Sequence, residues 1–349
     1  MKDRRRWIII GMFALAVSFT SAAAQQPYVS NEFWSAYKAR FLIGNGRIVD
    51  NANGDISHSE GQGYGLLLSF LANNRADFEQ IWSFTRTELL VRDDGLAAWK
   101  WDPAATPHVT DSNNATDGDI LIAYALALAG SSWHRLDYVE QAAKIANSLL
   151  SHTIVDVGGQ TVLLPAAAGF GAGERDDAPV VNPSYWIFEA LPVMALLAPS
   201  DDWAKLSEDG LALLRVSQFG PRRLPAEWES LAHKPKPAVG FPQEFGYNAV
   251  RIPLYLMRGN IYDRDLLTRL SQGMTDEGGT ISTIDLETGW TKEPLSDPGY
   301  QIINHLIGCV LNGTKLPASV QQFEPILYYP STLQLLALAF VRERHPECL

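Results

Sequence analysis

The fold class is set at a junction where Asp111-Ser-Asn-Asn-Ala-Thr-Asp-Gly-Asp119 runs directly into Ile120-Leu-Ile-Ala-Tyr-Ala-Leu-Ala-Leu128. The first half holds the acids, amides and hydroxyls that cap a helix or open its first turn. The second half is an apolar run with helical spacing. The junction therefore predicts a helix that carries acidic side chains at its N-terminus.

The same spacing of apolar residues recurs along most of the chain and predicts helices separated by short loops. Short loops favour antiparallel helical hairpins, and a closed ring of such hairpins is one architecture that follows. The clearest predicted helices are Asn31 to Phe41, Gly65 to Ala72, Phe78 to Leu90, Ile120 to Leu128, Tyr138 to Leu150, Tyr185 to Leu197, Leu266 to Met274, Gln301 to Leu311 and Leu333 to Arg342.

Strand patterns are few and short. Residues 161–164 and 280–286 alternate as small hairpin strands do, and residues 220–245, rich in proline and aromatics, are predicted to form a long ordered loop. No linker or low-complexity tract follows Gln25. We therefore predict one all-α domain over residues 25–349, with a few short β-hairpins in its loops.

The first 24 residues have the layout of a cleavable secretory signal. Lys2 and Arg4 to Arg6 precede an apolar run, and Ala22-Ala-Ala24 precedes Gln25. We expect cleavage after Ala24, a secreted or periplasmic protein, and no stable membrane span afterwards. An uncleaved anchor is the alternative.

The acidic net charge of the chain argues against nucleic acid as a partner. The whole chain has a net charge of −11; without residues 1–24 it keeps 24 basic and 38 acidic residues, a net charge of −14. Such a chain is a poor ligand for nucleic acid.

The two cysteines leave two possibilities open. Cys309 and Cys348 could form one disulfide or stay free. No motif with metal-ligand spacing occurs, so we predict neither a metal nor a cofactor.

A second acidic motif is Ser57-His-Ser-Glu60-Gly-Gln-Gly-Tyr-Gly65, which precedes an apolar helix. Its glycines leave room for a ligand beside Glu60, although Ser57 or Ser59 could equally be a helix cap with Glu60 complementing the helix dipole. Taken with Asp117, the motif suggests the paired carboxyls of a glycosidase, one protonated and one ionised.

Both acidic motifs resemble those of a known enzyme family. The segment Ala115-Thr-Asp117-Gly-Asp-Ile-Leu-Ile-Ala123, continuing to Trp133, resembles the signature of glycoside hydrolase family 8, and the Glu60 segment is similar to the family's other acidic motif. The likeness extends from about Trp34 to Tyr329. It is strongest to bacterial endoglucanases of cellulose-synthesis gene clusters.

The resemblance implies an (α/α)6 barrel, an inverting mechanism and an open cleft for a β-1,4-linked polysaccharide. By position, Glu60 matches the family's proton donor. Asp117 matches its signature aspartate, which in an inverting enzyme would position water and the distorted sugar. An inverting pair is separated by roughly 6.5–9.5 Å, which leaves space for the attacking water.

One departure leaves the general base open. Where many relatives read Ser-Tyr-Asp-Ala-x-Arg, this chain reads Gly246-Tyr-Asn-Ala-Val-Arg251. The amide of Asn248 can orient water but cannot take its proton in the ordinary way. The candidates for the base are Asp117, ranked first, then Glu244 and Asp111. Arg251 and Tyr247 are expected to support the site.

Sugar binding needs flat aromatic faces with polar edges. We predict a platform drawn from aromatics in or near loops, while Trp82 and Trp133 are assigned to the core. The platform candidates are Trp99, Trp101, Tyr185, Trp186, Trp228, Tyr247 and Tyr328.

The leading hypothesis is therefore a monomeric secreted endo-β-1,4-glucanase acting on cellulose-like chains, with a functional link to a cellulose synthase complex. A second hypothesis keeps the fold and changes the glycan to chitosan, lichenan or xylan. A third, motivated by Asn248, is a glucan-binding accessory factor with weak or no hydrolysis.

Overall fold

The computed structural model describes residues 27–349, so the predicted signal segment lies outside the described residues. This part is rich in helix, as predicted. Its α-helices are α1 (Asn31–Phe41), α2 (Ser59–Leu71), α3 (Arg75–Phe84), α4 (Thr116–Trp133), α5 (Leu136–His152), α6 (Leu191–Leu197), α7 (Asp202–Val216), α8 (Ile252–Arg258), α9 (Arg264–Met274), α10 (Pro298–Asn312), α11 (Ala318–Gln321) and α12 (Tyr328–Arg344).

Four short helical segments of other types lie between or after them. The π-helix η1 (Thr85–Leu89) extends α3, and the 3₁₀ helix η3 (Ala249–Arg251) leads straight into α8. The other two 3₁₀ helices are η2 (Pro183–Tyr185) and η4 (Pro346–Cys348).

The strands form four small antiparallel sheets in the loops. β1 (Ser57–His58) pairs with β2 (Lys100–Trp101), and β3 (Ile154–Val157) with β4 (Gln160–Leu163). The two three-stranded sheets contain β5 (Val180–Val181), β6 (Glu229–Ser230) and β7 (Lys236–Pro237), and β8 (Glu244–Phe245), β9 (Ser282–Asp285) and β10 (Thr291–Pro294).

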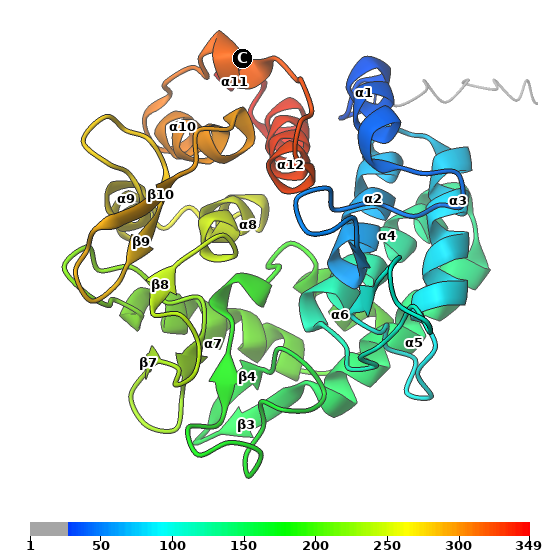
Figure 1. The fold of residues 1–349 in the computed structure, drawn as a ribbon, viewed down its shortest axis with the longest axis horizontal. Helices are drawn as coiled ribbons and strands as arrows, with labels where there is room; N and C mark the ends of the chain where they lie inside the picture. The colour runs from blue at the N-terminus through cyan, green and yellow to red at the C-terminus, as the bar shows by residue number, and fades with distance from the viewer. Residues whose placement is uncertain (1–26) are drawn as a thin grey trace, which may run out of the picture.

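The helices follow one another once around the molecule, so the end of the chain returns to its beginning (Figure 1). There α12 contacts both α1 and α2, and the Tyr37 hydroxyl on α1 lies 2.9 Å from the Thr332 hydroxyl on α12. α3 lies outside α2, and α5 outside α4 (Figure 1). The inner faces bury a continuous apolar core.

Two predicted helices differ from the observed elements. The segment from Tyr185 to Leu197 is helical only from Leu191, because Pro183 and Asn182 start a separate 3₁₀ turn before it. The segment from Phe78 to Leu90 changes from α-helix to π-helix at Thr85. The predicted long loop over residues 220–245 is largely irregular but contributes β6, β7 and β8.

The tail is covalently tied to the body of the molecule. Cys309 on α10 and Cys348 in η4 form a disulfide, which is one of the two alternatives left open by the sequence. Within residues 27–349 no helix has both the length and the apolarity needed to cross a membrane.

Candidate active site

The two acidic motifs meet because α2 and α4 begin side by side. A Cβ added to Gly118 would lie 2.2 Å from the Ser59 hydroxyl and 2.6 Å from the Glu60 nitrogen, and one added to Gly63 would lie 2.5 Å from Leu121 Cβ. Only glycine permits such close approach of two backbones. These glycines therefore place Glu60 and Asp117, each in the first turn of its helix, in one site.

Arg251 joins the two acids. Its Nη1 donates to Glu60 Oε2 at 2.7 Å, and its Nη2 donates to Asp117 Oδ2 at 2.6 Å. The arginine side chain is fully buried and that of Asp117 is 1% exposed, whereas that of Glu60 is 15% exposed. Glu60 is thus the member of the pair that a ligand can reach.

The two carboxyls differ in protonation. Burial and then the negative charge of Glu60 raise the pKa of Asp117 to about 7. Burial also opposes ionisation of Glu60, but the charges of Arg251 and His58 outweigh it and lower the pKa of that carboxyl. Up to about pH 7 the pair therefore keeps one proton, because two adjacent buried carboxylates cannot both ionise at low cost.

Tyrosines surround the Arg251 guanidinium. The rings of Tyr185 and Tyr255 lie 5.8 and 5.6 Å from its central carbon, and the Tyr329 hydroxyl accepts from Nη1 at 3.5 Å. The Tyr64 hydroxyl bonds to that of Tyr255. Tyr64, Tyr255 and Tyr329 were not singled out in the sequence, since aromatic residues within helical patterns look like core.

The helix that carries Glu60 is capped by His58. Its Nδ1 accepts the Gly61 N–H at 2.9 Å, and its Nε2 lies 3.5 Å from Asp50 Oδ2. Sequence reasoning offered Ser57 or Ser59 as the cap, and the structure assigns this function to the histidine instead. His58 thereby fixes the first turn of α2 and with it the position of Glu60.

The candidate bases lie in different surroundings. Asn248 immediately precedes η3. Its carbonyl accepts the Arg251 N–H, one turn later, at 3.3 Å. Glu244 is ion-paired with Lys292. Asp111 accepts from the Trp99 indole and the Asn113 N–H, each at 2.9 Å, and these two bonds lower its pKa.

Glu227 is a further carboxyl near Asn248 that sequence reasoning missed. It is 8% exposed, and its Oε1 accepts the Asn248 N–H at 2.7 Å. It lies in the irregular segment before β6, so no helical or strand pattern pointed to it.

The predicted aromatic platform is only partly available. Tyr247 is 42% exposed, while Trp99 and Tyr185 are half-buried. Trp101 is buried and contacts Phe84 and His108. It therefore offers little open face.

Of the three further platform candidates, two are buried. Trp186 is 2% exposed, and its indole donates to the Leu206 carbonyl, so assigning it to a sugar platform was wrong. Tyr328 is 1% exposed. Trp228 is half-buried and stacks with Phe170 and with Phe241.

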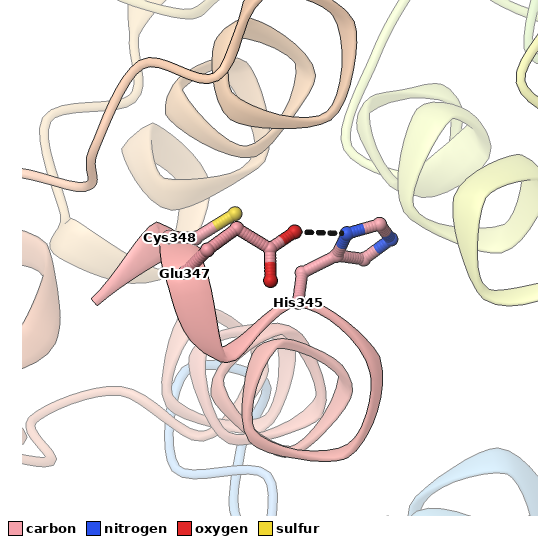
Figure 2. A group of neighbouring side chains, drawn as sticks. All are labelled: His345, Glu347 and Cys348. Carbon is pink, nitrogen blue, oxygen red and sulfur yellow. Dashed lines mark hydrogen bonds and ion pairs between the residues drawn. The ribbon is translucent and has the colours of Figure 1, made fainter.

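One group of potential metal ligands occurs in the described part of the chain, at its C-terminal end. His345, Glu347 and Cys348 lie close together (Figure 2). The sulfur of Cys348 is already bonded to Cys309, and His345 Nδ1 lies 3.0 Å from Glu347 Oε1. A disulfide sulfur is not the thiolate that binds metals, so this group does not make a metal site.

Paired acidic side chains of unequal pKa, one reachable and one buried, are the machinery of glycoside hydrolysis. The profile of glycosyl hydrolases family 8 matches residues 4–340, and this chain belongs to that family.

Individual relatives agree with this assignment. The chain is 33% identical over 329 residues to a probable endoglucanase of Novacetimonas hansenii, covering 93% of this chain and 94% of the relative. It is 39% identical over 245 residues to an endoglucanase of Cellulomonas uda, covering 69% and 67%. The structure of endo-β-1,4-glucanase CMCax from Acetobacter xylinum superposes with a TM-score of 0.80 at 33% identity, covering 89% of this chain and 98% of that one.

Proposed function

We propose that this protein is an exported endo-β-1,4-glucanase that cleaves internal β-1,4-glucosidic bonds with inversion, on an (α/α)6 barrel. The observation that carries the proposal is the attachment of Glu60 and Asp117 to one buried arginine at the adjoining starts of two helices. The names of the relatives at 33–39% identity supply the glycan class.

In this mechanism Glu60 is the general acid. Its carboxyl is the exposed member of the pair. Below about pH 7 the proton of the pair is on Asp117, so the acid step requires that this proton pass from Asp117 to Glu60. Approach of the glycosidic oxygen favours transfer of this proton to the leaving group. Removing or misplacing a general acid typically costs about 10²- to 10⁴-fold in rate.

Asp117 and Arg251 position Glu60. The side chain of Asp117 is 1% exposed and that of Arg251 is fully buried, which suits two groups that hold the acid in place from behind. Among the predicted platform residues, Tyr247 is exposed, and Trp99, Tyr185 and Trp228 have half-exposed surface for neighbouring sugars.

We further propose export through the N-terminal signal with cleavage after Ala24, action as a monomer, and a functional link to a cellulose synthase complex. These rest on the layout of residues 1–24 and on the likeness to endoglucanases of cellulose-synthesis gene clusters.

Two measurements on purified protein test the proposal. Carboxymethylcellulose should lose viscosity faster than it gains reducing ends, as internal cleavage requires, and xylan, chitosan and lichenan in parallel compare the other glycans. Proton NMR of early cello-oligosaccharide products should show the α-anomer first. Glu60→Gln is the inactive control. Absence of hydrolysis with retained glucan binding would instead support the accessory-factor hypothesis.

A further inference from the structure

An inverting site needs a group that takes the proton of the attacking water, and three of the acids near this site are poorly placed for it. Asp117 is 1% exposed and is held by the Arg251 guanidinium that also holds Glu60, so it is shielded from water and paired with the acid itself. The carboxylate of Glu244 is engaged in an ion pair with Lys292. Hydrogen bonds from the Asn113 N–H and the Trp99 indole lower the pKa of Asp111 and make it a weaker base.

Glu227 meets the requirements that these acids do not. Its carboxylate is held by the Asn248 N–H through Oε1 at 2.7 Å. None of the ion pairs found within residues 27–349 includes Glu227. Burial raises the pKa of this carboxyl, which brings its basicity closer to that of an effective proton acceptor.

The backbone is shaped around this carboxylate. A Cβ added to Gly246 would lie 2.4 Å from Glu227 Oε1 and 2.6 Å from its carboxyl carbon. A residue larger than glycine at this position would displace Glu227. Both departures from the Ser-Tyr-Asp-Ala-x-Arg pattern, Gly246 and Asn248, therefore contact the same carboxylate.

Glu227 also belongs to the electrostatic neighbourhood of the acid pair. The charge of Arg251 acts on its carboxyl. The charges of Asp117, Glu60 and Glu227 all act on the Tyr185 hydroxyl. Glu227 contacts the residue that precedes η3, the 3₁₀ helix that ends at Arg251, while Glu60 and Asp117 stand in the first turns of α2 and α4.

We propose that Glu227 is the general base of this enzyme and that Asn248 orients the water from which it takes a proton. As the water oxygen bonds to the anomeric carbon, the bond from that carbon to the glycosidic oxygen breaks. The water proton passes to Glu227, and the proton of Glu60 passes to the leaving oxygen. This assignment rests on the proposed hydrolytic function and names the residue that acts as its general base.

Glu227→Gln is the first test, because the amide oxygen keeps the bond to the Asn248 N–H and removes only the basicity. Turnover should fall about 10²- to 10⁴-fold on two substrates: carboxymethylcellulose and a 2,4-dinitrophenyl β-cellotrioside. The activated substrate needs no acid, so Glu60→Gln should lose the first activity and retain much of the second. A variant that lacks the general base should lose activity on both substrates.

Glu229→Gln is the matched control. Glu229 lies two residues away, is fully buried, and accepts from the Ser217 hydroxyl and the Ala226 N–H. The same substitution there should leave both activities within about threefold. Cello-oligosaccharide binding by calorimetry and thermal unfolding check that each variant is folded.

Azide gives a second, positive readout. In Glu227→Ala, azide can enter the space of the water and attack without a base, so it should restore turnover of the activated substrate and yield the α-glycosyl azide. If the wild type hydrolyses glucan and folded Glu227→Gln stays within threefold of it, the assignment of Glu227 is overturned. If the wild type itself is inactive, the proposed function fails instead.

Discussion

Arg251 holds Asp117 Oδ2 at 2.6 Å with one guanidinium nitrogen and Glu60 Oε2 at 2.7 Å with the other. The two bonds need the planar fork of arginine, because a lysine ammonium is a single point of charge. The arrangement sets the spacing of the acids, and the charge of Arg251 counteracts the effect of burial on the pKa of each carboxyl.

Arg251→Lys should therefore lower kcat by about 10²-fold or more while keeping the net charge, since one of the two acids loses its partner. Arg258→Lys is the control, because Arg258, at the end of α8, makes a comparable buried pair with Glu189. It should lower the melting temperature without a matching loss of kcat. Equal kcat losses in both variants would show that the effect is only structural.

The contact between α2 and α4 gives a second prediction. Gly118→Ala forces a methyl group against Ser59 and the Glu60 backbone, and overpacking of this kind costs about 1–3 kcal/mol. Because the displaced segment carries Glu60, activity should fall further than stability alone explains.

Gly308→Ala on α10 is the comparison for that variant. Its added Cβ would meet only Thr314 Cβ at 4.0 Å, so the protein should keep its activity and gain up to about 1 kcal/mol from helix propensity. Steady-state kinetics and thermal melts of the two variants decide the matter. A fully active Gly118→Ala would mean that the glycine contact does not position the acid.

Stability should fall as the pH rises. Burial raises the pKa of Glu229 from 4.5 to about 8, despite its bonds from Ser217 and Ala226. Its protonated form is favoured by folding, so this stabilisation is complete below about pH 4.5 and is lost as the pH rises through about 8. The slope is about 1.4 kcal/mol per pH unit for one such group. Asp119, whose pKa burial raises to about 7, acts in the same direction.

Glu229→Gln should flatten this decline, since the amide cannot ionise. Denaturant unfolding of both proteins at pH 5, 7 and 9 measures it. Parallel curves for the wild type and the variant would show that Glu229 is ionised in the folded protein.

The sequence predicted the parts of the site that depend on local signals. Glu60 and Asp117 each stand in a motif of polar and glycine residues before an apolar helix, so their helix-start positions could be derived. Glu227 could not, because its importance comes from the N–H of Asn248, 21 residues later, and from the missing side chain of Gly246.

Trp186 shows the reverse error. A tryptophan beside a predicted loop suggested a sugar platform, but the indole fits against α7, where a Cβ on Gly210 would lie 2.1 Å from its Nε1. Trp186 and Gly210 are far apart in the sequence, so no periodic pattern of residues could predict that they are in contact.

The last prediction concerns Asn248→Asp. This change places a second carboxylate beside Glu227, whose Oε1 already lies 2.7 Å from the Asn248 backbone nitrogen. Two carboxylates on residues in contact disfavour joint ionisation, so the single variant should show no large gain in kcat and a rise in the pH at which activity appears.

In a Glu227→Gln background the same change should instead restore much of the lost rate, because the new aspartate supplies a carboxylate where relatives carry theirs. The double-mutant cycle in kcat therefore measures whether the two positions substitute for each other. A gain of about 10²-fold or more in the single variant would mean that the wild type lacks an effective base. Additive losses in the double variant would mean that Glu227 and residue 248 act independently, and the base would then have to be sought elsewhere in the site.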